Sequence, residues 1–368
     1  MEEKIRVLHL MNRWYPKGGI EHFIQSLVER TAFNNNIEYH IASMLTSVNS
    51  SVPCAKHGPI LKSGSILGLP FEIASLGNFL KTGKYDVIHI HTNNGTGFLY
   101  AHAAKKAGVI KRVVHCHNAG VGQSCKRLKE VSGSLLRSMY LKDATDRWAC
   151  SANAGEYLFS HEKFRVFLNG IDIDAFKFSI EARSRIRAKL GVDKEVILVG
   201  NIGRLASQKN PIFQLHVFKE FLKFVPSAKF CMVGRGELES DRDEYISNEK
   251  LTESVICIPE TSEPASYYSA FDVLLFPPIF EGLTFVGIEA QCSGLPIVSS
   301  DVVPKELKMT ELISFFSLRE SPERWAEELW RVVQIHGSED RSKYSALVAQ
   351  AGYDIDGCFQ KIAKAYRQ

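Results

Sequence analysis

The feature that most constrains the fold is an alternation of strand-like and helix-like segments. Residues 5–10 form an apolar run typical of a buried strand, and the apolar residues after Gly18 and Gly19 recur at the spacing of one helical face. Strands that alternate with helices predict a doubly wound parallel sheet. Further strand-like runs lie at 37–41, 85–90 and 111–115.

The alternation restarts near the turn-forming pair Asn169-Gly170. A chain of 368 residues therefore predicts two α/β domains, one over 1–168 and one that begins at 169. Two such domains that face each other form a cleft, and a ligand is expected at the carboxyl ends of the strands. The strand-like runs of the second domain lie at 196–200, 228–233, 255–258, 273–276 and 296–299.

The composition is that of a soluble protein, with 45% hydrophobic and 23% charged residues. No window of about 18 uncharged apolar residues exists, so no membrane-spanning helix is predicted. The eight cysteines are scattered and form no C-x-x-C pair, which fits a reducing cytosol and argues against a disulfide framework or a zinc knuckle. We therefore expect a cytoplasmic protein.

Basic residues are concentrated in 101–150, where ten lysine and arginine residues meet three acidic ones. Within 123–147, an apolar helical face surrounded by basic residues fits an interfacial helix on anionic lipid. A core-facing helix with a basic solvent side fits equally well. Nucleic acid is not favoured as a partner, because the segment has no recognition module or aromatic platform. The apolar face comprises Leu128, Val131, Leu135, Leu136, Met139 and Tyr140, and the basic residues are Lys126, Arg127, Lys129, Arg137 and Lys142.

The strongest motif is a pair of glutamates eight residues apart. Glu281 lies in a glycine-containing turn after a strand, and Glu289 lies about one turn into a helix expected to begin near Thr284. A helix start offers free N–H groups and a partial positive charge, which suits a phosphate. A carboxylate in such a site can accept hydrogen bonds from sugar hydroxyls.

A second motif follows the strand at 196–200. Arg204 and Lys209 lie five residues apart and can clamp a diphosphate, although two exposed loop cations would look the same. Gly234 belongs to a G-x-G after the next strand, which permits close backbone approach to a nucleotide but lacks the full dinucleotide motif.

Two H-x-H pairs end neighbouring strand-like runs in the first domain. In His89/His91 and in His115/His117 both side chains lie on one face of the strand, a geometry that can bind zinc. No cysteine or carboxylate accompanies either pair at a ligand spacing, so no metal site is predicted, and His89 is interpreted as a satisfied core histidine. The D-x-D string at 172–174 is interpreted as a turn.

Taken in order, the 169–172 turn, the Gly203-Arg204…Lys209 segment and the E-x7-E element resemble the retaining glycosyltransferases of family 4, which have the GT-B architecture. The resemblance covers nearly the whole chain, and 280–306 further resembles the branch that builds bacterial capsular polysaccharide and exopolysaccharide. It implies two Rossmann-like domains that face a central cleft. Residues 1–168, joined by a crossover helix at about 350–368, would bind the acceptor, and 169–349 would bind the nucleotide-sugar donor.

The resemblance also implies roles for individual residues. Arg204 and Lys209 would hold the donor pyrophosphate, Glu281 would contact the transferred sugar, and Glu289 would accept hydrogen bonds from the ribose. His115, or alternatively its neighbour His117, would face the sugars. No metal or other cofactor is expected. The remaining donor-binding positions are Gly18, Gly19, Gly203, Gly234, Gly282, Leu283 and Thr284.

The expected activity is transfer of a hexosyl or N-acetylhexosaminyl unit from a nucleotide-diphosphate sugar, with uridine favoured, to a glycan or a polyprenyl-linked acceptor. Transfer would retain the anomeric configuration and would take place in the cytoplasm or on the inner face of a bacterial membrane. The same architecture is also compatible with a UDP-sugar 2-epimerase and with a catalytically inactive nucleotide-sugar-binding subunit.

Overall fold

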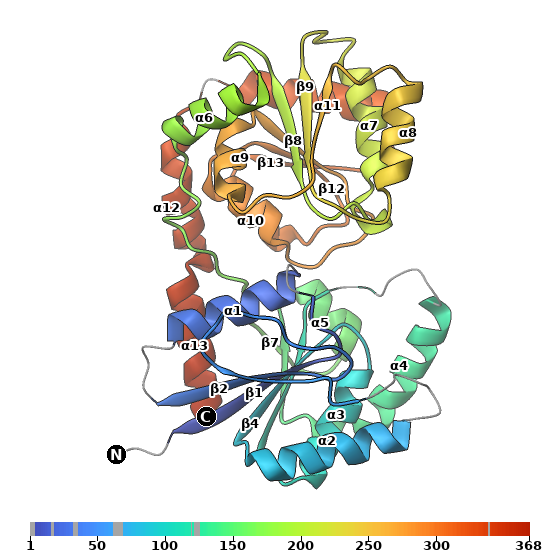
Figure 1. Cartoon of the computed structure of the whole chain (residues 1–368), viewed down its shortest axis with the longest axis vertical. Helices are drawn as coiled ribbons and strands as arrows, with labels where there is room; N and C mark the ends of the chain where they lie inside the picture. Colours follow the sequence, from blue (N-terminus) through green and yellow to red (C-terminus); the bar gives the residue numbers. More distant parts are fainter. Residues whose placement is uncertain are drawn as a thin grey trace. The chain divides into compact units, whose positions relative to one another are not determined.

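The computed structural model describes residues 4–15, 18–31, 36–61, 69–118, 120, 126–337 and 339–368, and the chain divides into two compact units (Figure 1). The first unit comprises Met1–Asn169 with Asp356–Gln368, and the second comprises Gly170–Ile355. The sequence puts the boundary one residue earlier and begins the returning segment at about 350.

The first unit is built on a seven-stranded parallel sheet with the order β3-β2-β1-β4-β5-β6-β7. The predicted parallel sheet is therefore confirmed. Its outer strands β3, β6 and β7 were not predicted, because runs of two to four residues with several polar side chains carry no clear pattern. The strands are β1 (Ile5–Met11), β2 (Ile37–Ser43), β3 (Ala55–His57), β4 (Val87–Thr92), β5 (Lys111–Cys116), β6 (Asp146–Ala149) and β7 (Arg165–Val166).

Helices cover both faces of this sheet, and Figure 1 shows α1 and α2 on opposite sides of it. The C-terminal helix α13 packs beside α1, where the rings of Phe359 and Phe23 lie 5.9 Å apart and Asp356 pairs with Arg30. No helix in the described residues is long and apolar enough to cross a bilayer. The helices are α1 (Gly19–Thr31), α2 (Leu69–Gly83), α3 (Thr96–Lys106), α4 (Lys126–Tyr140), α5 (Ala152–Phe159) and α13 (Ile355–Arg367).

The second unit holds a six-stranded parallel sheet with the order β10-β9-β8-β11-β12-β13. The strands are β8 (Leu198–Ile202), β9 (Lys229–Val233), β10 (Val255–Ile258), β11 (Val273–Phe276), β12 (Ile297–Ser300) and β13 (Ile313–Phe316), of which β13 was not predicted. The helices are α6 (Ile180–Leu190), α7 (Pro211–Phe221), α8 (Glu239–Asn248), α9 (Pro264–Ala270), α10 (Phe285–Cys292), α11 (Pro322–His336) and α12 (Tyr344–Val348).

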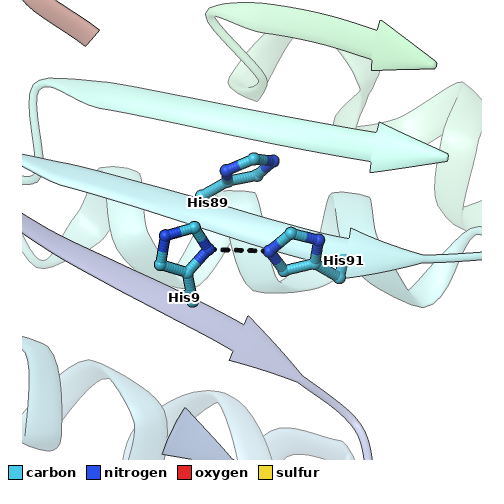
Figure 2. A group of neighbouring side chains, drawn as sticks. All are labelled: His9, His89 and His91. Atoms are coloured by element: carbon cyan, nitrogen blue, oxygen red, sulfur yellow. Dashed lines mark hydrogen bonds between the residues drawn. The ribbon is translucent and has the colours of Figure 1, made fainter. Parts of the chain in front are cut away.

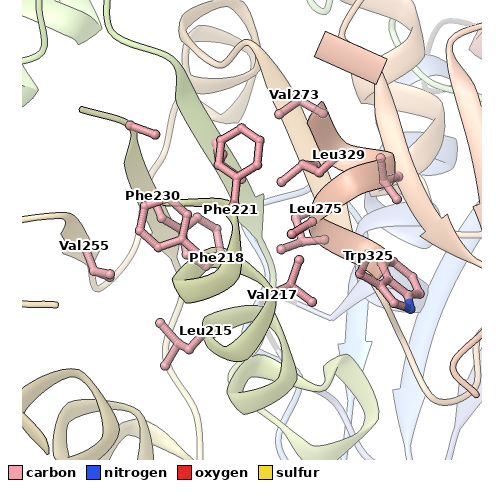
Figure 3. Close-up of a cluster of buried hydrophobic side chains, with 14 of the residues drawn as sticks. Leu215, Val217, Phe218, Phe221, Phe230, Val255, Val273, Leu275, Trp325 and Leu329 are labelled. Carbon is pink, nitrogen blue, oxygen red and sulfur yellow. The ribbon is translucent and has the colours of Figure 1, made fainter. Parts of the chain in front are cut away.

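The core of the second unit lies between this sheet and the helices α7 and α11. Figure 3 shows Phe218 and Phe221 of α7 packed among strand residues, with Trp325 of α11 in the same cluster. All three side chains are fully buried. This apolar layer holds the strands in register, so that the loops at their carboxyl ends are positioned by a rigid scaffold.

Candidate active site

The loops after β8 and β9 touch through two glycines. Gly234 has a φ of +147°, and a Cβ atom there would lie 1.9 Å from the carbonyl oxygen of Gly203. The Gly203 N–H donates to the carbonyl oxygen of Val233 at 2.9 Å. Only glycine fits at 234, because both the backbone conformation and the contact exclude a side chain. The two predicted donor-site glycines are thus brought into direct contact.

Lys209 and Glu281 form an ion pair across the loops that follow β8 and β11. The pair is largely shielded, with 19% of the Lys209 side chain and 11% of the Glu281 side chain exposed. The Lys209 ammonium also lies 5.3 Å from the centre of the Phe276 ring. The structure therefore joins two residues that the sequence analysis assigned to one site, and it adds a direct contact that was not predicted.

Two hydrogen bonds to backbone carbonyl oxygens hold these two loops together. The Gln208 side-chain amide donates to the carbonyl oxygen of Phe280 at 3.0 Å, and the Ile279 N–H donates to that of Gln208 at 2.8 Å. Lys209 ends a short 3₁₀ turn (Ser207–Lys209) just before α7. The ammonium and the carboxylate are consequently fixed by neighbouring backbone rather than by long flexible loops.

Arg204 is exposed, unlike Lys209. Within the part of the chain that the structure describes, its guanidinium has no hydrogen-bond or ion-pair partner. The chain next to it is fixed, since the Leu205 N–H donates to the Arg235 carbonyl oxygen at 2.8 Å. A guanidinium on an anchored backbone with its donors free can bind an anion in bidentate fashion.

The segment from Gly282 to Thr284 leads into α10, which begins at Phe285 as expected. Its three residues are buried, and Thr284 makes no side-chain capping hydrogen bond. The amino end of α10, with its partial positive charge, therefore follows directly on the turn that carries Glu281. The amino end of α10, the Lys209 ammonium and the Glu281 carboxylate therefore lie at the same edge of the second sheet.

Glu289, the fifth residue of α10, is 8% exposed and accepts a hydrogen bond of 2.9 Å from the Tyr268 hydroxyl. Burial raises the pKa of Glu289 to about 7, and the hydrogen bond from Tyr268 opposes that rise. With a pKa of about 7, the carboxyl group of Glu289 is about half protonated near neutral pH. A solvent-facing position for Glu289 is excluded.

In the first unit, Gly18 and Gly19 lie where α1 begins. A Cβ atom at Gly18 would lie 2.0 Å from a carboxylate oxygen of Glu21, and the same carboxylate accepts the Tyr15 N–H at 2.8 Å. Burial raises the pKa of Glu21. The glycine thus makes room for a buried carboxylate that fixes the preceding loop. Contact of this loop with phosphates stays a prediction.

The first unit also gathers five buried histidines from β1, β4, β5 and the residue just after β5: His9, His89, His91, His115 and His117. Figure 2 shows His9 of β1 beside His89 and His91 of β4. We call them the histidine cluster. β4 lies between β1 and β5, so His89 pairs in register with His9, and His91 with His115. His89 bonds to the Tyr366 hydroxyl and to His115, which confirms it as a satisfied core histidine. His115 is fully buried, whereas His117 is 8% exposed. Their predicted contact with sugars stays a prediction.

Each half of the chain matches a known glycosyltransferase family model. The model described as Glycosyltransferase Family 4 matches residues 17–175, and the one described as Glycosyl transferases group 1 matches residues 182–346. A protein named glycosyltransferase EpsF, from Bacillus subtilis (strain 168), is 30% identical over 372 residues, which cover 95% of this chain and 93% of that protein. The chain belongs to the family 4 glycosyltransferases.

This glycosyltransferase is also similar to an Escherichia coli protein named UDP-Gal:alpha-D-GlcNAc-diphosphoundecaprenol alpha-1,3-galactosyltransferase. The two are 28% identical over 240 residues, which cover 63% of this chain and 62% of that protein.

Solved structures establish the fold. HepE from Anabaena, in complex with UDP, superposes with a TM-score of 0.76 at 17% identity and covers 98% of this chain and 99% of its own. Sucrose-phosphate synthase from Thermosynechococcus elongatus superposes with a TM-score of 0.79 at 17% identity and covers 99% of each chain. The glycosyltransferase therefore has the GT-B fold, as the sequence resemblance implied.

Sequence reasoning missed three features of the glycosyltransferase. It did not single out His9, although a histidine in a buried strand is an available signal, and it did not foresee that both H-x-H pairs would join. It also assigned Glu289 no partner, whereas Tyr268 binds it. The D-x-D string is a turn, as predicted, because Asp172 accepts the Ala175 N–H at 3.1 Å.

Proposed function

We propose that this glycosyltransferase moves a hexosyl or N-acetylhexosaminyl unit, with retention, from a UDP-sugar to a glycan or lipid-linked acceptor in surface polysaccharide biosynthesis. The observation that carries the proposal is the shielded Lys209–Glu281 pair beside the amino end of α10. The UDP donor is supported by HepE, which was solved with UDP and with UDP-glucose, and the lipid-linked acceptor by the name of the Escherichia coli relative.

The chemistry follows from where charge develops. Cleaving the bond between sugar and phosphate leaves negative charge on the departing diphosphate, and fixed cations stabilise that charge most in a site shielded from water. Arg204 supplies a guanidinium that has no partner among the described residues, and Lys209 supplies a positioned ammonium. Glu281 contacts the sugar that is transferred. We propose that these residues, rather than a metal ion, neutralise the diphosphate.

The Lys209–Glu281 contact makes the proposal sharper. A diphosphate that binds Lys209 competes with the Glu281 carboxylate for the same ammonium. Glu281→Gln should therefore bind UDP at least as tightly as the natural protein while losing transfer, and Lys209→Gln should lose both. A simple structural pair would give similar, small effects from either substitution.

The experiment measures UDP binding by calorimetry and transfer with a panel of UDP-sugars and lipid-linked acceptors. A matched control is the half-buried Lys219–Glu249 pair in the same unit, where Lys219→Gln should change neither readout. Equal UDP affinity in Lys209→Gln and the natural protein would refute the site.

Incubation with the donor alone tests the alternative 2-epimerase activity, because an epimerase would alter the sugar. UDP binding without transfer to any acceptor would favour an inactive binding subunit.

A contact between α4 and an anionic membrane is the second part of the proposal. α4 exposes Val131, Leu135 and Met139 at successive turns, with 63%, 60% and 58% of each exposed. Its other side packs on α3, where a Cβ atom at Gly95 would lie 2.1 Å from the carbonyl oxygen of Gly133. The exposed stripe is thus unused by the described core. Residues 123–125 and the side chains of Lys126, Leu128 and Lys129 lie outside the described residues.

Sedimentation with phosphatidylglycerol vesicles tests this contact. We expect salt-sensitive binding that is lost when Val131, Leu135 and Met139 are all replaced by serine. The control replaces the exposed Ile110, which lies outside α4, and should leave binding intact. Absence of vesicle binding at low salt would remove the membrane contact without touching the proposed transfer reaction.

A further inference from the structure

The two carboxylate oxygens of Glu289, in α10, have different surroundings. Oε2 accepts a hydrogen bond of 2.9 Å from the Tyr268 hydroxyl. Oε1 has no hydrogen-bond partner among the described residues but is not enclosed, and the residue keeps 8% of its surface exposed. A buried carboxylate that has one oxygen occupied and the other accessible suits a ligand that donates a hydrogen bond from a hydroxyl group.

The tyrosine that occupies Oε2 is itself held in place. Tyr268 belongs to α9 and is fully buried. Its carbonyl oxygen accepts a hydrogen bond of 2.8 Å from the Arg341 guanidinium, which also donates to the carbonyl oxygen of Ser293 at 2.9 Å. Ser293 directly follows α10, so one arginine ties the carboxyl ends of α9 and α10 together. The hydroxyl and the carboxylate therefore meet between two helices whose ends are joined.

We propose that Tyr268 is a positioning residue for the nucleotide: its hydroxyl fixes Glu289 so that Oε1 faces the ribose hydroxyls of the donor. Because the Tyr268 side chain is fully buried, its effect on the ligand passes through Glu289. The inference rests on the proposed UDP-sugar donor. It adds a residue that determines how the ribose is held without contacting it.

The place of Glu289 in α10 fits a ribose that is joined to a diphosphate at Lys209. The turn that carries Glu281, the partner of Lys209, leads into the amino end of α10. Glu289 is the fifth residue of this helix, about 6 Å along the axis from the first. The ribose of UDP is attached directly to the diphosphate, so we expect it at the first turns of α10. A ribose hydroxyl that donates to a carboxylate forms a charge-assisted hydrogen bond.

The charge of Glu289 depends on the same hydroxyl. A carboxylate accepts hydrogen bonds on both oxygens only when it is ionised. Burial raises the pKa of Glu289 to about 7, and the hydrogen bond from Tyr268 opposes the rise. Two other groups lie near these helices. Burial raises the pKa of the Cys292 thiol in α10 to about 12, so it stays neutral at pH 8, and the Arg341 guanidinium donates to backbone carbonyl oxygens.

The test compares UDP with 2′,3′-dideoxyuridine 5′-diphosphate, which lacks both ribose hydroxyls, by calorimetry on the full chain at pH 8. The natural protein should prefer UDP by roughly tenfold or more, because the analogue cannot donate to Oε1. Tyr268→Phe should reduce this preference to about threefold or less while it leaves the affinity for the analogue unchanged. The ratio of the two affinities cancels any general loss of binding.

A matched control is Tyr344→Phe. It removes the hydroxyl of another fully buried tyrosine in the same unit, which donates to Glu311 at 3.0 Å, and it should keep the full preference for UDP. A second variant, Glu289→Asp, keeps the charge but shortens the side chain, so that one carboxylate can no longer reach both Tyr268 and the ribose. Its preference for UDP should also be lost.

Full preference for UDP in Tyr268→Phe or in Glu289→Asp would overturn the inference. So would equal affinity of the natural chain for the two nucleotides, although the donor site would then stand. A preference that Tyr268→Phe regains between pH 8 and pH 9 would also overturn it, since the hydroxyl would then act only through the charge of Glu289. Absence of UDP binding by the natural chain would instead overturn the proposed donor together with this inference.

Discussion

Replacing Glu289 by glutamine should make the second unit more stable at high pH and should remove a pH dependence that the natural protein carries. Glu289 is buried in α10 and touches the Tyr268 hydroxyl. Glutamine keeps the shape and an oxygen that can accept that hydrogen bond. The substitution therefore removes a titrating group with little change in packing.

The magnitude follows from the pKa of Glu289, which is 4.5 for an ordinary glutamate and about 7 here. Because the folded state binds the proton more tightly than the unfolded state, the free energy of unfolding is highest below pH 4.5. It falls between about pH 4.5 and 7 and is flat above. At ~1.4 kcal/mol for each pKa unit, the natural protein loses about 3 kcal/mol across this window.

The assay is urea unfolding of both proteins at several pH values, followed by tryptophan fluorescence. The first unit is identical in the two, so the difference in the free energy of unfolding isolates the second unit. That difference should grow by about 3 kcal/mol in favour of Glu289→Gln between pH 4.5 and 8. The control is Glu237→Gln, which alters an exposed glutamate in the same unit. A difference that stays constant over this range would refute a buried carboxyl group with a raised pKa.

Three further outcomes are expected from the second unit. Gly234→Ala should cost more than about 1 kcal/mol of stability in urea unfolding and weaken UDP binding in calorimetry, because alanine tolerates neither the φ of +147° nor the 1.9 Å contact. Phe218→Ala should cost about 3–5 kcal/mol in the same unfolding assay, whereas Phe224→Ala, at a 45% exposed site, should cost about 1 kcal/mol or less. Tyr268→Phe should raise the pKa of Glu289 further, seen as a shift of the stability-against-pH curve to higher pH, because the hydrogen bond that opposes the rise is lost. Equal costs at the two phenylalanines, an unstrained Gly234→Ala or an unmoved curve would contradict the respective argument.

The sequence could predict the sheets because their central strands are long apolar runs, and the donor loops because glycines and charged residues follow those runs directly. It could not predict that the Lys209 ammonium and the Glu281 carboxylate touch. They lie 72 residues apart, and their contact depends on β8 and β11 being neighbours. Strand order is decided by the packing of whole layers, and no local pattern around either residue records it.

The histidine cluster shows the same limit in a sharper form. Ligand spacings read from a sequence describe metal sites built within one loop or helix, and by that measure two H-x-H pairs 26 residues apart do not belong together. In a parallel sheet the spacing along the chain does not matter, because two neighbouring strands present side chains at equal height whatever crossover joins them. His91 and His115 face each other for this reason. The histidine cluster is therefore revealed by the order and register of β1, β4 and β5, and no spacing along the chain predicts it.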